Sequence, residues 1–421
     1  MSDQRFQKIL PSAPDTARKE SSDRAAIPAP ATRRPMLATL MIASALSPLA
    51  INIFIPSMAS IARDLHADGA TVGLGLSLYL AATAIIQLLA GPLSDRFGRR
   101  PVILGGMVLF LIGTALCLIA RDVGLFLAGR VVQAASATGI ALSRAVVRDV
   151  YSRERAAAMI GYVTMGLAVA PMLGPAIGGV MDTAFGWRSV FWLLAVMGVA
   201  TTTLLVFDLS ETNNDRGKPI ASQLRSYGEL TRSSAFWIYV GVSSLTSGVF
   251  FAFLGGAPFV AVDILAMTPA GYGLWFGLGA LGYMAGNFGT ARLSVRLGIK
   301  TLMVSGAGLT LSAAILSLIA VATGHLSPLT LFGPMLLVGI GNGLALPTAT
   351  AGGVSVRPEA AGAAAGLLGA CQIGLGAISS ILAAILATSA VGAVGLTALM
   401  TGFGLAGLAC ALAARRVRPS P

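Results

Sequence analysis

Apolar runs of about 20 residues follow one another along most of this chain, separated by short polar stretches. A helix of that length is enough to cross the hydrocarbon core of a bilayer, and a scan for such runs predicts roughly twelve spans. Several runs contain Gly and Pro, which membrane helices tolerate because neighbouring helices re-satisfy the freed backbone groups. The expected spans are centred near Leu46, Ala82, Phe110, Ala137, Val169, Leu194, Phe250, Leu281, Ile315, Gly341, Ile373 and Gly402.

The composition excludes a soluble globular domain. Hydrophobic residues make up 55% of the chain and charged residues 11%, and the mean hydropathy is +0.81. Soluble domains carry about a quarter charged residues. We therefore expect an all-α membrane protein.

The basic residues predict the orientation in the membrane. With the N-terminus inside, almost all of the 29 Lys and Arg residues fall in inner loops, the central linker or the two termini, where Lys and Arg are retained. Only Arg63, Arg121 and Arg188 fall outside, and Arg130 lies within a span. Both termini are thus expected in the cytoplasm. The net charge of +12 reflects topology and contact with anionic lipids rather than a nucleic-acid partner, because it is spread over many loops.

An internal repeat predicts two halves. Residues 93–100 align with 293–300, and residues 139–142 with 343–346, at an offset of about 200 and in the same orientation. Repeats of this kind predict two six-helix bundles with the pathway between them and a substrate site near the midplane. We expect a disordered cytoplasmic tail at 1–35, bundles at 36–209 and 235–414, a cytoplasmic linker at 210–234 and a cytoplasmic tail at 415–421.

The sequence gives no support to an enzyme. Cys117, Cys371 and Cys410 lie in apolar runs without metal-like spacing, and His66 and His325 fall in short outer loops. We see no nucleophile with a base, no phosphate-binding loop and no metal cluster. Neither a catalytic site, a metal site nor a cofactor is therefore expected.

A polar, basic stretch, GPLSDRFGRRP at residues 91–101, lies between the second and third spans. Asp95 stands where a carboxylate can cap a neighbouring helix N-terminus and pair with Arg96, Arg99 or Arg148. A solvated turn that obeys charge topology is the alternative, and it explains the arginines better than it explains Asp95. The stretch resembles the signature loop of the major facilitator superfamily. That resemblance implies a latch favouring the outward-facing state, formed by Gly91, Asp95, Arg96, Gly98, Arg99 and Arg100 with Arg148.

Arg130 falls within the fourth span, in the run GRVVQ. An arginine at membrane depth is costly, so we expect it to face a cavity and to have a partner. The alternative is that it extends toward the surface near Arg121 and Asp122. Arg130 and Gln133 resemble the superfamily's fourth-helix Arg-Gln motif, with Ala134 in place of the usual glycine.

The fifth span contains small residues and prolines at Pro171, Gly174, Pro175, Gly178 and Gly179. Such residues allow a second helix to approach closely, and proline adds a bend. The pattern resembles the motif of drug and proton antiporters among the facilitators, although general glycine-rich helix packing explains it equally well. Gly186, Trp187, Arg188 and Phe191 match the same subgroup.

Together with LSPL at 46–49, Tyr79, Gln87 and FLGGAPF at 253–259, these motifs resemble the bicyclomycin and chloramphenicol exporter family, Bcr/CflA. The resemblance covers nearly all of the chain after residue 36. It implies export of drugs from the bacterial inner membrane by antiport with protons.

One departure from that family bears on the mechanism. Many members carry an aspartate four residues before a first-span proline, whereas here Asn52 precedes Pro56, and a carboxamide cannot titrate. We assign every acid to a loop or a span end, with Asp182 outside, so no mid-membrane carboxylate is expected. Proton coupling is then left to Asp263 or Asp95. The third possibility is that Arg130 stays charged and favours neutral or anionic cargo, with weak or absent coupling.

We expect the substrate cavity to be aromatic and Met-rich with a few polar points. Asn52, Arg130 and Gln133 are the leading candidates because polar atoms in a bilayer must find partners. Each aromatic residue taken singly has helix packing or lipid contact as its commoner role. The candidates are Asn52, Phe54, Tyr79, Gln87, Arg130, Gln133, Met165, Tyr239, Phe250, Phe251, Phe253, Tyr283, Asn287 and Asn342.

The function expected from these patterns is secondary export of amphipathic drugs by alternating access. An exporter or importer of an endogenous metabolite, such as an amino acid or sugar, is the first alternative; the scarcity of polar residues within the spans weighs against it. A non-transporting receptor or scaffold is the second, and the intact loop motif and both half-repeats weigh against that. A chain with its own internal pathway is expected to act as a monomer.

Overall fold

The structure, a computed structural model, describes residues 35–151, 159, 163, 173–213, 228, 230–357 and 361–416. Residues 1–34 of the predicted tail at 1–35, residues 417–421 of the predicted C-terminal tail, most of the linker, Met165 and Pro171 lie outside the described residues. Wherever secondary structure is assigned in this part of the chain, it is helical. The predicted all-α fold class is therefore confirmed.

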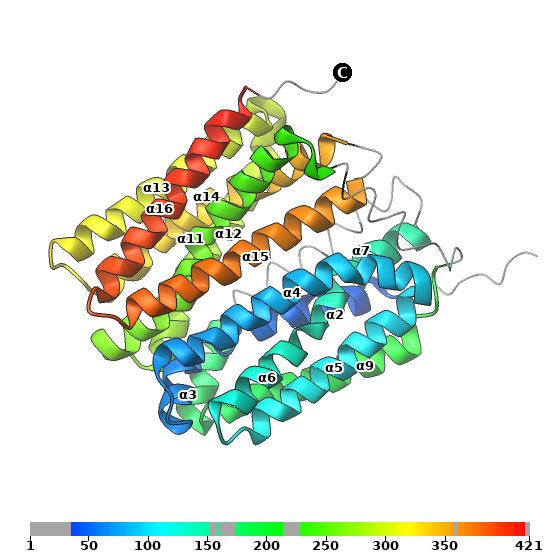
Figure 1. The fold of residues 1–421 in the computed structure, drawn as a ribbon, viewed down its shortest axis with the longest axis horizontal. Helices are drawn as coiled ribbons and strands as arrows, with labels where there is room; N and C mark the ends of the chain where they lie inside the picture. Colours follow the sequence, from blue (N-terminus) through cyan, green and yellow to red (C-terminus); the bar gives the residue numbers. More distant parts are fainter. Residues whose placement is uncertain are drawn as a thin grey trace, which may run out of the picture.

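The first half forms one bundle, drawn in blue to green in the lower part of Figure 1. Pro48 lies within its first helix, and the first span continues beyond that helix through a short 3-10 turn into α3. Residues 173–185 are also helical and belong to the fifth predicted span. The elements are α2 (Leu37–Asn52), η1 (Ile55–Ser57), α3 (Met58–Asp64), α4 (Gly69–Phe97), α5 (Arg99–Ile119), α6 (Val123–Gln133), η2 (Ala134–Ser136), α7 (Ala137–Val150) and α9 (Arg188–Asp208).

The second half forms the other bundle, drawn in green to red in the upper part of Figure 1. Its first span ends in a π-helix rather than continuing as a regular α-helix. The elements are α11 (Ser234–Phe259), η3 (Val260–Ile264), α12 (Pro269–Leu297), α13 (Ile299–Ala322), α14 (Pro328–Ser355), α15 (Ala361–Ala387) and α16 (Gly392–Ala414).

Ten helical stretches in the described residues are long and apolar enough to cross a membrane. Helix α12 is 29 residues long and is not among the ten, because its many Gly residues lower its hydropathy. With α12 and the helical residues 173–185, the described helices account for each of the twelve predicted spans.

The repeat predicted from the sequence extends to the backbone. Helices α4 and α12 begin and end at positions 200 residues apart, and each ends at a glycine with positive φ, Gly98 at 104° and Gly298 at 76°. His66 and Ala266, in the turns before these helices, both have φ of 51°. The turns at His66 and Ala266 lie at the predicted outer end of the molecule, and Gly98 and Gly298 lie at the predicted inner end.

The two bundles meet along α4 and α15, which lie side by side in Figure 1. Ser77 donates a buried hydrogen bond of 3.2 Å to Ser380 across this contact. A Cβ on Gly73 would lie 2.9 Å from the Cβ of Ala384, so the absence of a side chain there allows the close approach. On the other side of the interface, Gly179 and Gly273 lie against backbone carbonyls of the opposite bundle.

We predict that Asp68→Ala lowers the unfolding free energy by about 1 kcal/mol, because Asp68 caps the N-terminus of α4. Its carboxylate accepts hydrogen bonds from the Thr71 hydroxyl (2.6 Å) and the Thr71 amide (2.8 Å), and these bonds hold its pKa below the usual value. A lowered folded-state pKa means that the contribution is present at neutral pH and is lost as the pH falls through that pKa.

The measurement is thermal unfolding of the purified protein in detergent at several pH values. Asp68→Asn is the matched control, since it keeps an acceptor oxygen but cannot titrate. Equal unfolding temperatures for the wild type and Asp68→Ala at neutral pH would contradict the prediction.

Candidate functional site

Arg130 is the largest fully buried side chain of the described chain, with no exposed surface. It lies near the end of α6, where the helix passes into the 3-10 turn η2. Its guanidinium carbon stands 4.0 Å from the centre of the Phe54 ring and 4.5 Å from the centre of the Tyr79 ring. Aromatic faces attract a cation, and the attraction is stronger when water is excluded.

Neutral groups take up the hydrogen bonds of Arg130. Nε donates to the carbonyl of Gly75 (3.3 Å), and Nη1 donates to the carbonyl of Ala50 (3.2 Å) and to Oε1 of Gln133. Helix α2 ends at Asn52, so the carbonyl of Ala50 belongs to the last turn, where carbonyls lack a partner within the helix. Nη2 has no hydrogen-bond partner in the structure. In the described part of the chain, no carboxylate pairs with this guanidinium.

A second layer of polar contacts holds these partners in place. Nε2 of Gln133 donates to the hydroxyl of Thr114 (2.9 Å), which fixes the amide oxygen toward Arg130. The Tyr79 hydroxyl lies 2.8 Å from that of Ser136 and 3.1 Å from that of Ser47. Arg130 thus has partners, as predicted, and they are several neutral groups of its own bundle. The predicted cavity is not reached, because the guanidinium is fully buried in this conformation.

Asn52, at the end of α2, is 3% exposed. Its Nδ2 donates to the carbonyl of Pro48 (2.7 Å), while Oδ1 has no partner. Asn342, in the second bundle, is equally buried and also has an unpartnered Oδ1. Buried polar atoms without partners are uncommon, so both are points at which a ligand or a water molecule can bind.

The aromatic candidates of the second bundle form a separate cluster. Phe250 and Phe253 pack against Phe276, with ring centres 6.1 and 6.4 Å apart, and Phe253 meets Phe332 edge-on at 5.4 Å. Tyr272 joins this cluster and was not among the candidates from the sequence; its buried hydroxyl has no partner. The cluster shows that the candidate residues do not converge in one place, since Arg130 and its neighbours lie inside the other bundle.

The remaining candidates for the substrate cavity lie apart from the surroundings of Arg130 and from the aromatic cluster around Phe253. Gln87 is half-buried, and a Cβ on Gly369 of α15 would lie 3.1 Å from its Oε1. Asn287 donates to the carbonyl of Tyr283 within its own helix (2.8 Å). Tyr239 packs in a small cluster at the other end of α11. Met165 lies outside the described residues.

The predicted latch residues form a network at the inner end of the first bundle. Arg99 pairs with Asp95 at 2.6 Å and with Asp149 at 3.1 Å. Its Nη1 also donates to the hydroxyl of Ser94. Of the three partners predicted for Asp95, the structure selects Arg99. Arg148 is exposed.

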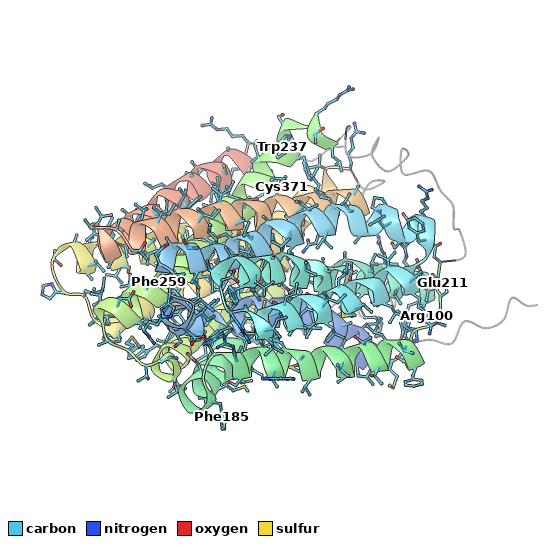
Figure 2. The ribbon with its side chains drawn as sticks, turned by 60° about the horizontal axis from the view of Figure 1, so that its bottom comes forward. Arg100, Phe185, Glu211, Trp237, Phe259 and Cys371 are labelled. Carbon is cyan, nitrogen blue, oxygen red and sulfur yellow. The ribbon has the colours of Figure 1, made fainter. Side chains whose placement is uncertain are left out.

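Glu211, which was not among the candidates from the sequence, caps the N-terminus of α5. Its carboxylate accepts from the backbone amides of Arg99 (2.9 Å) and Arg100 (3.3 Å), at the N-terminus of α5. Figure 2 shows Glu211 beside Arg100. Gly98 precedes this turn with φ of 104°, and a side chain there would collide with Glu211. At the N-terminus of α5 the first acid after α9 is therefore the cap, and the capping role predicted for Asp95 stays a prediction for other helices.

The two residues after Glu211 bind the same network. The Thr212 hydroxyl donates to Asp149 (3.2 Å), and Nδ2 of Asn213 donates to the carbonyls of Ser94 (3.2 Å) and Asp95 (3.3 Å). The start of the linker is thus fastened to the predicted latch loop. No sequence signal joined these positions, because they are more than 60 residues apart along the chain.

The small residues of the fifth span face two other helices. Gly174 and Gly178 lie against the backbone at Asn52 and Ile53, where α2 ends. Gly179 lies against the carbonyl of Pro269 at the start of α12, in the other bundle. Pro175 carries the carbonyl that lies against Gly273 of α12. Of the predicted motif, only Pro171 falls outside the described residues.

The acids at the predicted outer end differ in their exposure. Asp64 accepts from Arg188 (2.7 Å) and from the indole of Trp187 (3.1 Å). Asp182, which was predicted to lie outside, stands three residues before the end of the helical residues 173–185, is 7% exposed and accepts from Ser60 (2.8 Å). The helix of the fifth span continues to residue 185, beyond its polar residues Asp182 and Thr183. Asp263 is exposed and lies in η3.

We predict that Glu211→Ala lowers the unfolding temperature, because it leaves the first amides of α5 without an acceptor and frees the start of the linker. A lost helix cap costs about 1 kcal/mol. Thermal unfolding in detergent measures the loss, and Glu211→Gln is the matched control because it keeps Oε1 as an acceptor. A Glu211→Ala variant as stable as the wild type would contradict the capping role.

The chain was compared with known proteins. The model of the Major Facilitator Superfamily matches residues 40–380. Multidrug resistance protein D of Escherichia coli (strain K12) is 32% identical over 390 residues, which are 89% of this chain and 94% of that protein. Multidrug resistance protein MdtL of Salmonella paratyphi A and the MFS-type transporter YdgK of Bacillus subtilis (strain 168) are each 30% identical, covering 82% of this chain and 87% of their own length.

Two solved structures share the fold. A bacterial homologue of the human lysosomal transporter Spinster, in an inward-facing and unoccupied conformation, has a TM-score of 0.69 at 15% identity, covering 91% of this chain and 98% of its own. The human organic anion transporter MFSD10 (TETRAN) has a TM-score of 0.65 at 18% identity, covering 90% and 99%. The family match and these folds agree with the two helical bundles described above. The chain belongs to the major facilitator superfamily and is a multi-pass membrane transporter.

Proposed function

We propose that this protein is a multidrug exporter of the Bcr/CflA family, which moves amphipathic drugs out of the cell by alternating access. The observation that carries the proposal is its similarity, over most of its length, to relatives named multidrug resistance proteins. The loop at 91–101, the Arg130–Gln133 pair and the small residues of the fifth span support the same subgroup. In this role the protein lies in the bacterial inner membrane with both termini in the cytoplasm. It acts as a monomer.

The contacts between the bundles support alternating access. Small residues and backbone carbonyls make the interface at Gly73, Gly179 and Gly273, and one serine pair bridges α4 and α15. The contacts at Gly179 and Gly273 are with backbone atoms of the opposite bundle, so the bundles can separate and re-form them without rearranging side chains. The latch network at Asp95, Arg99 and Glu211 would then favour one of the two states.

We propose that the cargo contacts residues of both bundles, which do not converge in the conformation described here. The aromatic cluster around Phe253 supplies apolar faces, and the unpartnered Oδ1 atoms of Asn52 and Asn342 supply acceptors. Arg130 influences cargo through its charge, which neutral groups leave uncompensated. Neutral and anionic compounds are therefore preferred over cationic dyes.

Proton antiport is part of the proposal, and its site is one of two acids. Asn52 replaces the first-span acid of the family, so the proton must bind elsewhere. Asp263 is exposed at the predicted outer end, and Asp95 is paired with Arg99 at the predicted inner end. Asp95 is already engaged by Arg99, which leaves Asp263 as the proposed proton site.

The test uses inverted membrane vesicles that contain the protein and are energised to a stable pH gradient. We expect chloramphenicol-like and anionic compounds to dissipate the gradient more than cationic ones do. Vesicles without the protein are the control. Accumulation of labelled compound with an unchanged gradient would rule out proton antiport but keep export, and no movement of any compound would reject drug export.

We predict that Arg130→Ala abolishes transport and lowers stability by about 2–4 kcal/mol, because a void opens between Phe54 and Tyr79 and several acceptors lose their donor. Arg130→Lys is the folded control: it keeps the charge, but one ammonium cannot bind Gly75, Ala50 and Gln133 together. We expect it to express normally and to transport at least about tenfold more slowly, a loss of about 1.4 kcal/mol. Normal transport by Arg130→Ala, measured as drug uptake into vesicles, would contradict the prediction.

A further inference from the structure

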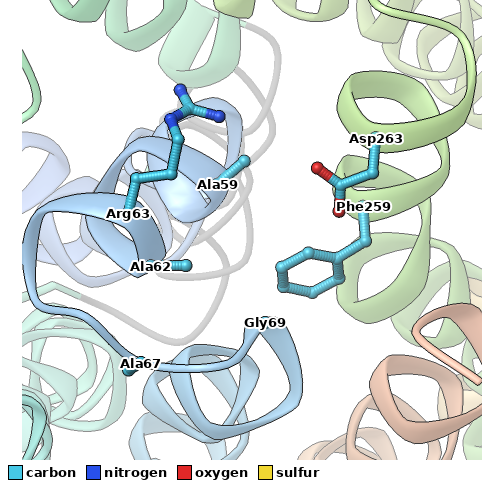
Figure 3. A pocket seen from close by; sticks show the side chains of 7 residues that line it. All are labelled: Ala59, Ala62, Arg63, Ala67, Gly69, Phe259 and Asp263. Atoms are coloured by element: carbon cyan, nitrogen blue, oxygen red, sulfur yellow. The ribbon is translucent and has the colours of Figure 1, made fainter.

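A small cavity lies between the two bundles at the predicted outer end. Its volume is about 170 Å³, and its walls come from α3 and the start of α4 on one side and from Phe259 and Asp263 on the other. Figure 3 shows Arg63 and Asp263 on opposite walls. These are the charged residues that line it, and one belongs to each bundle.

Arg63 and Asp263 occupy equivalent positions in the two halves. Helices α4 and α12 begin 200 residues apart, and the turns before them share the same backbone conformation at His66 and Ala266. Positions 63 and 263 follow the same offset. In two bundles related by approximate two-fold symmetry, equivalent positions near the axis face each other. Here one position carries a cation and the other an anion, so the repeat has become electrostatically complementary at this point.

The backbone around Asp263 is shaped to place it there. The amide of Leu265 bonds to the carbonyl of Val260 (3.1 Å) in the wide turn of the π-helix η3. Such turns occur mostly as single insertions within α-helices, and frequently at functional sites. One turn earlier, the Phe259 ring reaches across the interface to the start of α4, where a Cβ on Gly69 would lie 2.8 Å from it.

The charged pair is close but not in contact. No ion pair within 4.0 Å joins Arg63 to Asp263, and Arg63 donates instead to the hydroxyl of Ser60 at 3.3 Å. Both side chains are exposed, and the cavity between them is large enough for several water molecules. Their attraction therefore acts through water and is sensitive to salt.

We propose that Arg63 and Asp263 form a charge gate that holds the outer ends of the two bundles together. This proposal rests on the proposed alternating access, and it states how the transporter closes toward the outside. In the state described here, the attraction across the cavity and the Phe259 contact keep the outer end shut. Opening to the outside separates the two charges, so anything that removes or reverses one of them favours the outward-open state.

The test measures the separation of the outer ends directly. Spin labels are placed at Arg121 in the first bundle and His325 in the second, in a background with Cys117, Cys371 and Cys410 replaced by alanine. Both label sites are exposed. Electron spin distance measurements in lipid nanodiscs then compare the labelled parent with Arg63→Asp, Asp263→Arg and the double exchange.

We expect each single charge reversal to raise the long-distance population several-fold and the double exchange to restore the parental distribution. In 1 M salt, where the screening length is about 3 Å, the parent should shift toward the long distance as well. Circular dichroism and size-exclusion chromatography check folding. If a reversed variant does not fold, Arg63→Gln and Asp263→Asn replace it, with a smaller shift in the same direction.

Unchanged distances in both single variants, or a double exchange that opens as far as the singles do, would overturn the gate. The distance measurement needs no cargo, so it tests the gate independently of the proposed drug export. Restored distances in the double exchange together with absent drug transport by the labelled parent would reject the proposed export alone. Unchanged distances in both single variants together with normal transport by the parent would reject the gate alone.

Discussion

The absence of water from the hydrocarbon core is the constraint on which the whole structure depends. Every backbone amide and carbonyl there must find its partner within the protein, and helices meet that demand segment by segment. Helices in lipid gain little from the hydrophobic effect when they associate, so close packing has to hold them together. The chain supplies 51 glycines, and many of them lie against a carbonyl of the next helix, as Gly139 does against Ala43 and Gly282 against Leu336.

The same constraint explains the surroundings of Arg130. A guanidinium without water needs acceptors, and the bundle provides them from helix ends and side-chain amides rather than from an acid. A carboxylate would have neutralised the charge, whereas carbonyls and aromatic faces stabilise it and leave it in place. The first bundle therefore carries a permanent positive centre, while the second carries an uncharged aromatic cluster. The two halves of the repeat have kept one backbone and diverged in electrostatics.

The helices and the two-bundle architecture could be predicted from the sequence because each span has to be apolar over a fixed length. Even α12, with its lower hydropathy, was expected from its run around Leu281. Contacts that depend on three-dimensional neighbours could not be predicted. The capping role of Glu211 comes from a loop more than 100 residues away, and two of the acceptors of Arg130 are backbone carbonyls, which have no residue signature.

The fastening of Glu211, Thr212 and Asn213 to the first bundle has a mechanical consequence. The tether between the bundles effectively starts after Asn213 instead of at the end of α9, and the next described residue of the second half is at position 228. Residues 211–213 therefore belong mechanically to the first bundle, and a force on the linker acts on their contacts with Asp149, Ser94 and the first amides of α5 before it reaches α9.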